Sequence, residues 1–249
     1  MNFEKNIYAE AISIIRKMFW LVVLFGLGGL LLAILKESAP TSQLALLVPE
    51  LFLWATLAYL AHRYVLLPNH PPFEDFNKQV RLFFRRFLAL SLISILPVFL
   101  LAIVLLLMFM DESFLSKEQL LGVIVLASLV VGGIIAGLML SLYGTWLPAS
   151  IMNDKTGFKQ AGVRGRRSFF HTLGRLILGP ALVTAASMYL FLAAIDHLNG
   201  NGIILEAIIN LDAPVLLINI MLQFANCFAT IITAVILSRA YLIATSTES

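Results

Sequence analysis

Five polar side chains recur along one face of a long apolar block near the C-terminus. They are Asn219, Gln223, Asn226, Thr230 and Thr233. Their spacings of four, three, four and three residues place all five on one side of a helix. Amides in hydrocarbon need hydrogen-bond partners, so this face should look into the protein. Two interpretations stay open: the side chains join helices, at about 0.6 kcal/mol for each bond, or they line a path for substrate or water.

A carboxylate stands within an earlier apolar block. Glu50 follows Pro49 and lies about seven residues, or roughly 10 Å, from the outer end of its helix at 1.5 Å per residue. A charge near mid-membrane costs about 2.5–3.5 kcal/mol, so Glu50 should face the helix bundle or be protonated. Asn219 and Gln223 are expected at a matching depth, which predicts a hydrogen bond from one of them to Glu50. The alternative is that Glu50 reaches the outer interface and has no role.

The chain has no recognisable motif for catalysis, metal binding or cofactor binding. Its histidines lack the i, i+4 ligand spacing, and there is no His-Glu-x-x-His, no Ser-His-Asp order and no phosphate-binding glycine loop. The single cysteine, Cys227, cannot form a disulfide or a Cys-based zinc site within one chain. We therefore expect no catalytic residue, no metal and no cofactor, and enzyme activity is disfavoured.

Lipid is the expected surroundings of most of the chain. Of 249 residues, 60% are hydrophobic and only 12% are charged, against about 25% charged in soluble domains. The apolar residues form blocks long enough to cross a hydrocarbon core of roughly 30 Å. The sequence predicts an all-α fold in which residues 1–249 form a single membrane domain of six transmembrane helices, at about 18–35, 44–67, 87–110, 120–147, 176–195 and 214–237.

Basic residues orient these six helices. All lysines and arginines except Lys36 and Lys117 fall on the same side of the predicted helices. Basic residues stay on the cytoplasmic side during insertion, so both termini are expected in the cytoplasm. The net charge of +3 is modest, and no nucleic-acid partner is expected.

Three basic, aromatic stretches lead into the predicted helical hairpins. They begin near Phe3, Phe73 and Phe158. We expect short interfacial helices whose basic faces meet anionic lipid. Their similarity indicates either an internal repeat or only the shared demands of one membrane interface. The predicted contacts with anionic headgroups on the cytoplasmic face are Arg85, Arg86, Arg164, Arg166 and Arg167.

A turn, a loop and a basic pair follow one another in residues 147–170, LPASIMNDKTGFKQAGVRGRRSFF. This order resembles a pattern in bacterial six-helix membrane proteins: the membrane domain attached to some glycerophosphodiester phosphodiesterases, and uncharacterised inner-membrane proteins similar to it. The matching residues are Leu147, Pro148, Ala149, Asp154, Gly157, Arg166, Arg167 and Ser168. The family usually has alanine four residues before that serine, where this chain has Arg164. The resemblance implies a bacterial inner-membrane location but no catalytic residue, because the phosphodiesterase chemistry belongs to a separate soluble domain.

These features predict a non-enzymatic membrane protein that handles or senses a lipid or small solute, as a transporter or a transporter-associated subunit. The alternative is a membrane scaffold, whose amides only join helices and whose basic segments bind anionic lipid or a cytoplasmic partner. A third hypothesis, an intramembrane lipid-modifying enzyme, requires several ionisable side chains to converge on one cavity.

Overall fold

Helices make up all the regular structure of the described residues. The computed structural model describes residues 6–38, 43–69, 76–109, 117–154, 157–199 and 213–246. Helix is the expected form of a chain in lipid, because it satisfies the backbone hydrogen-bonding groups within one segment. The elements are α1 (Ile7–Lys17), α2 (Phe19–Ser38), α3 (Gln43–Leu66), α4 (Phe76–Phe109), α5 (Lys117–Tyr143), α6 (Trp146–Ile151), α7 (Phe158–Leu176), the π-helix η2 (Ile177–Ala181), α8 (Leu182–Asn199) and α10 (Ala213–Ser246).

Five helical stretches of the described chain are long and apolar enough to cross a membrane. They are Phe19–Lys36, Ala45–Leu66, Lys78–Leu107, Phe158–Leu190 and Leu216–Ser246. In α5 the described residues add a shorter apolar stretch, Val130–Tyr143. The all-α class and the multi-pass character are thereby confirmed.

Several predicted helix boundaries differ from the observed ones. α4 begins at Phe76 and not near residue 87, because its basic first turns contain no proline or glycine that would end the helix. α10 continues to Ser246, past the predicted end at residue 237. α5 ends at Tyr143, and α6 forms a separate short helix with Pro148 in its first turn, where a missing backbone N–H does no harm.

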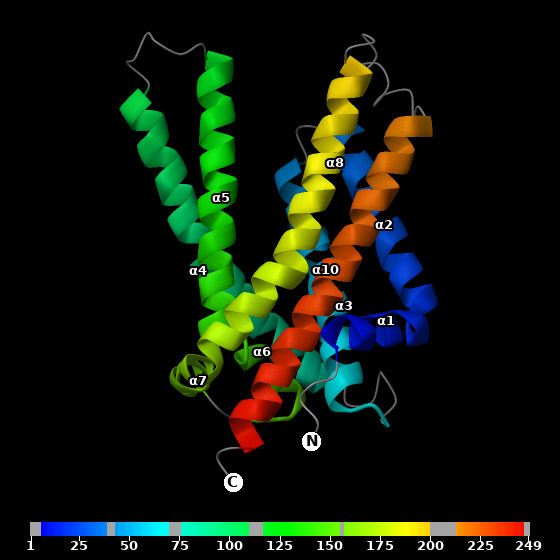
Figure 1. Ribbon diagram of the computed structural model, residues 1–249, viewed down its shortest axis with the longest axis vertical. Helices are drawn as coiled ribbons and strands as arrows, with labels where there is room; N and C mark the ends of the chain where they lie inside the picture. The colour runs from blue at the N-terminus through cyan, green and yellow to red at the C-terminus, as the bar shows by residue number, and fades with distance from the viewer. Residues whose placement is uncertain are drawn as a thin grey trace.

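α7 and α8 follow one another without an interruption of the helix. The five-residue π-helix η2 joins them and contains Pro180. Proline removes a backbone donor and crowds the preceding turn, and a wider turn accommodates that defect. The helical path therefore runs from the base of the molecule, along α7, up into α8 (Figure 1).

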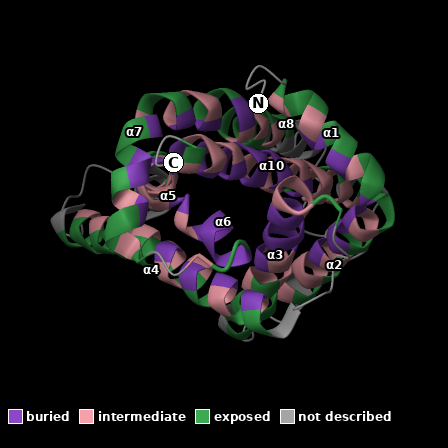
Figure 2. Ribbon diagram, turned by 90° about the horizontal axis from the view of Figure 1, so that it is seen from below, coloured by how far each residue is buried: buried purple, intermediate pink, exposed green. Residues whose placement is uncertain are grey.

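Several helices meet at one end of the bundle. α1, α6, α7 and the C-terminal end of α10 lie at this end, which we call the base (Figure 1). α4 and α5 stand beside each other on one side of the molecule, and α2, α3, α8 and α10 stand on the other (Figure 1). Seen from below, α6 lies inside a ring of the longer helices (Figure 2). Its residues from Leu147 to Ile151 are all buried, so α6 fills the middle of the base.

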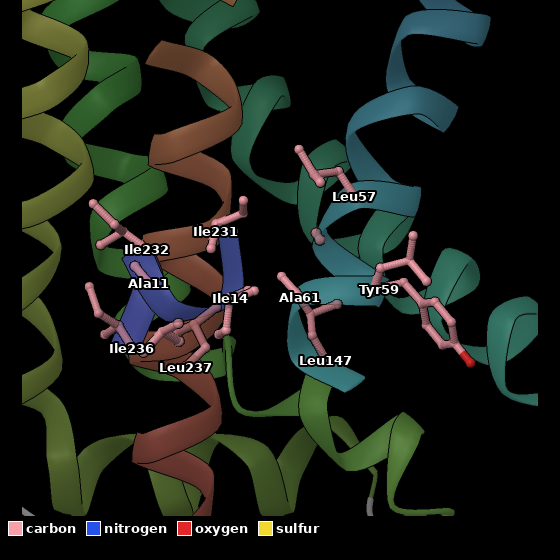
Figure 3. Close-up of a cluster of buried hydrophobic side chains, with 14 of the residues drawn as sticks. Ala11, Ile14, Leu57, Tyr59, Ala61, Leu147, Ile231, Ile232, Ile236 and Leu237 are labelled. Atoms are coloured by element: carbon pink, nitrogen blue, oxygen red, sulfur yellow. The ribbon is translucent and has the colours of Figure 1, made fainter. Parts of the chain in front are cut away.

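The buried core sits at the base, where α10 packs against α1, α2, α3, α7 and α8. Ile231 and Leu237 of α10, Leu57 of α3 and Leu147 of α6 are almost fully buried there (Figure 3). Tyr59 of α3 points away from α10 (Figure 3). Since lipid tails are as apolar as leucine, these contacts stabilise the bundle by close packing more than by escape from water.

The close approach of α7 to α5 requires a glycine. A Cβ atom at Gly165 would lie 1.9 Å from the carbonyl oxygen of Leu142, whereas a Cβ at Gly174 on the same helix would meet nothing within 4 Å. We expect Gly165→Ala to lower the free energy of unfolding by about 1–3 kcal/mol, the usual cost of overpacking. Gly174→Ala should leave stability unchanged or raise it by up to about 1 kcal/mol through helix propensity.

Equilibrium unfolding in detergent micelles measures both variants. Equal stability of the two alanine variants would contradict the close contact of α5 and α7.

Candidate functional site

The polar stripe of α10 divides into two parts with different neighbours. In the outer part, Gln223 packs into a notch on α2. A Cβ atom at Gly29 would lie 2.6 Å from Gln223 Oε1 and 3.3 Å from Trp54 Cζ2 of α3. Asn219 lies one turn farther out and is half-buried. Gln223 of α10 therefore packs closely against α2.

In the inner part, the stripe faces a cavity. Asn226, Thr230 and Thr233 line a space of about 430 Å³. Its other walls come from α3, α4, α5, α6, η2 and α8, and they include Trp54, His62, Phe87, Leu140, Leu147 and Thr184. This volume falls within the range of about 300–1,000 Å³ typical of small-molecule sites. The position of α6 closes the cavity toward the base, because Leu147 belongs to its lining.

The polar groups of the cavity wall are neutral. Thr230 donates to the carbonyl oxygen of Asn226, and Thr233 donates to that of Ala229, each at 2.8 Å. His62 Nδ1 lies 2.7 Å from Ser238 Oγ, so the buried imidazole is held between α3 and α10. The Asn226 side chain is exposed and offers both a donor and acceptors.

The lining of this cavity contains no carboxylate, lysine or arginine. A largely apolar space with a few hydroxyl and amide groups can hold an apolar chain and hydrogen-bond a neutral polar group. Among the described residues, no cluster of histidine, cysteine and carboxylate side chains could hold a metal ion.

Glu50 lies outside this cavity and has another partner than the one expected. Its carboxylate accepts from Lys36 Nζ, at the end of α2. Both side chains are partly exposed, at 23% for Lys36 and 33% for Glu50. A cation stabilises a carboxylate in low dielectric more than an amide does, which is the physical reason that Glu50 ties α2 to α3 and not to the stripe of α10.

The five arginines expected at lipid headgroups separate into two groups. Arg85, Arg166 and Arg167 are exposed. Arg86 and Arg164 are only 5% and 6% exposed, and they bind groups of the protein. The prediction that Arg86 and Arg164 contact lipid headgroups is therefore wrong. Their buried guanidinium groups need acceptors inside the protein.

Asp154 is the acceptor that gathers these buried groups. Arg164 of α7 donates to Asp154 Oδ2 at 2.9 Å, and the hydroxyl of Tyr241 of α10 donates to the same oxygen at 3.2 Å. Arg86 of α4 donates to the backbone oxygens of Trp146 at 2.8 Å and of Asp154 at 3.2 Å. The guanidinium groups of Arg86 and Arg164 also lie over the rings of Trp146 and Tyr241, each 5.3 Å from the ring centre. We call these five residues the Asp154 network.

Local sequence explains how Asp154 reaches this position. α6 ends at Ile151, and Asn153 adopts a left-handed backbone with φ of 53°. Asparagine tolerates this conformation better than most residues and so ends helices well. The Asp154 N–H then bonds back to the Ala149 carbonyl at 2.9 Å, which fixes the carboxylate beside α7.

Sequence reasoning missed most of these polar contacts. In the sequence, Asp154 matches only a loop pattern, and Arg164 is a departure from alanine that is predicted to contact lipid headgroups. A second unexpected pair joins Arg239 of α10 to Glu10 of α1, with two bonds of 2.9 and 2.7 Å. The only feature of the sequence that could have indicated these pairs is the position of Asp154 and Glu10, each an acidic residue within a basic region.

We expect Asp154→Ala to lower the free energy of unfolding by about 3 kcal/mol, near the lower end for a broken buried ion pair, because the Asp154 side chain is 22% exposed. The double variant Asp154→Ala, Arg164→Ala should recover part of this loss, since it removes the unpaired guanidinium. Thermal and chemical unfolding of the purified variants gives both values.

Arg166→Ala, on the exposed side of α7, is the matched control and should unfold like the unchanged protein. Strictly additive losses at residues 154 and 164 would show that the two charges do not stabilise each other.

No family model, curated protein or solved structure matches this chain.

Proposed function

We propose that this protein binds a lipid or other amphiphile in its intramembrane cavity and moves it or senses it, as a transporter or a transporter-associated subunit. One observation carries the proposal: Asn226, Thr230 and Thr233 line a cavity of about 430 Å³ whose remaining walls are largely apolar. Such a space suits an acyl chain with a neutral hydrogen-bonding group near it. It does not suit a small ion, because no charged side chain lines it.

Access from the bilayer supports a lipid-like ligand over a water-soluble one. Thr184 of α8 lines the cavity and is also exposed. Gly133 of α5 is exposed as well, and no described atom lies near the position that its side chain would take. α5 and α8 do not pack extensively against each other. An amphiphile in the membrane would therefore enter laterally between these helices.

The proposed membrane arrangement has six crossings, with α5 as the crossing additional to the five apolar stretches. Its 27 residues would span roughly 40 Å at 1.5 Å per residue. In this arrangement the base faces the cytoplasm of a bacterium, and α1, the start of α4, and α7 lie at the inner leaflet. The exposed Arg85, Arg166 and Arg167 would meet anionic headgroups there.

Cysteine labelling tests this orientation. In a Cys227→Ser background, Gln160→Cys on the exposed side of α7 should react with a membrane-impermeant maleimide only after the membrane is opened. Ser113→Cys, in the connection between α4 and α5, should react in intact cells. The reverse pattern would invert the proposed topology and place the base outside.

A bulky side chain placed in the cavity tests whether the ligand binds there. We expect Thr230→Trp to reduce crosslinking of a photoactivatable phospholipid, and its movement between leaflets of proteoliposomes, at least about tenfold, because the indole occupies the space. The matched control is Met221→Trp, at a position of α10 that is 59% exposed. It should keep both signals.

Circular dichroism and thermal unfolding establish that each tryptophan variant is folded. If folded Thr230→Trp keeps both lipid signals, the cavity is not the ligand site. Unchanged crosslinking and no lipid movement by any form of the protein would instead favour the scaffold hypothesis.

A further inference from the structure

A second, smaller cavity lies under α1, on a different side of α10 from the first. We call it the α1 slot. It measures about 240 Å³ and is bounded by Asn6, Tyr8, Arg175, Leu178, Ile232 and Ile236. Ile232 and Ile236 face this slot, while Thr233 and Leu237 of the same helix turns face the larger cavity. The two spaces thus share α10 as a wall without sharing a lining residue.

Two polar contacts hold α1 over the slot. The hydroxyl of Tyr8 donates to the carbonyl oxygen of Leu178 at 2.5 Å, which joins α1 to η2. The carboxylate of Glu10 accepts two bonds from Arg239, which joins α1 to α10. Ala11 and Ile14, on the inner face of α1, are buried. The slot is therefore a fixed space between packed elements and not a gap beside a loose terminal helix.

Arg175 gives the slot an uncompensated positive charge. It stands in the last turn of α7 and is half-buried. Among the described residues it has no hydrogen-bond or ion-pair partner, and the titratable groups that interact with it electrostatically are Arg239 and His171. Glu10 is the nearby carboxylate, and it already binds Arg239 through both oxygens. A partly buried guanidinium in such surroundings requires an anion.

The other walls of the slot show what kind of anion fits. Leu178, Ile232 and Ile236 are apolar, whereas Asn6 and Arg175 are polar. The Asn6 side-chain oxygen accepts from the Tyr8 N–H, so its amide nitrogen remains a donor. A guanidinium and an amide donor beside an apolar wall match a phosphate that carries a hydrocarbon chain.

We propose that the α1 slot binds one anionic phospholipid of the cytoplasmic leaflet. Arg175 binds the phosphate, and the first part of an acyl chain lies against Leu178, the exposed apolar residue of the slot. This site is separate from the larger cavity and does not depend on the function proposed for it. The bound lipid fixes the position of α1 and η2 against α10, so it couples the inner leaflet to the helix that both spaces share.

Native mass spectrometry tests the proposal on the purified full chain, titrated with phosphatidylglycerol, phosphatidylcholine or inorganic phosphate. We expect phosphatidylglycerol to bind in preference to phosphatidylcholine. Arg175→Gln should weaken that binding at least about tenfold, the factor expected for loss of one charge-assisted hydrogen bond. Lys159→Gln removes the same charge from an exposed position of the same helix and should bind like the unchanged protein.

A second pair of variants tests the slot without altering its charge. Leu178 and Leu182 are 65% and 58% exposed, and only Leu178 lines the slot. Leu178→Trp should therefore block phosphatidylglycerol, whereas Leu182→Trp should not. Thr230→Trp, in the larger cavity, should leave this binding unchanged, which separates the two sites.

Three outcomes would overturn the proposal. Equal losses in Arg175→Gln and Lys159→Gln would show only general attraction of basic residues to the lipid. Binding of inorganic phosphate as tight as that of phosphatidylglycerol would indicate a site for a free anion. If Leu178→Trp binds phosphatidylglycerol as tightly as the unchanged protein, the lipid does not bind in the α1 slot.

Discussion

The ion pair between Asp154 and Arg164 is the interaction on which the base of this protein depends. A carboxylate after a six-residue helix binds α7 and α10 directly, while its backbone binds α4 through Arg86. Polar contacts in a poorly hydrated region are directional and costly to break, so a few of them can set the positions of several helices. Because α6 is held in this way, it closes the base beneath the larger cavity.

α10 is the element that relates the parts of the molecule to one another. One face carries the polar stripe, first packed against Gly29 of α2 and then turned toward the cavity. Another face, at Ile232 and Ile236, lines the α1 slot. Near its C-terminal end, Arg239 binds α1. Ligands in the two spaces would therefore contact the same turns of α10 on different faces, which gives the two proposed sites a shared structural element.

A lipid environment explains both the apolar side chains that are exposed and the polar side chains that are buried. α4 and α8 expose large apolar side chains such as Phe99 and Tyr189 that a soluble protein would bury. Several buried polar residues are instead paired inside the protein: His62 with Ser238 of α10, and Arg63 with Gln79 of α4. This inversion of the usual surface leaves close packing and internal hydrogen bonds as the main forces between helices.

The sequence alone predicts the all-α class, the multi-pass character and the polar face of the last helix, because hydropathy and helical period are local properties. It does not show which neighbours that face meets. Only the tertiary packing places Gln223 against α2 and Thr230 at the cavity. The partners of Glu50, Asp154 and Arg164 were equally unpredictable. An ion pair depends on the distance between helices far apart in the chain, and only the packed bundle sets that distance.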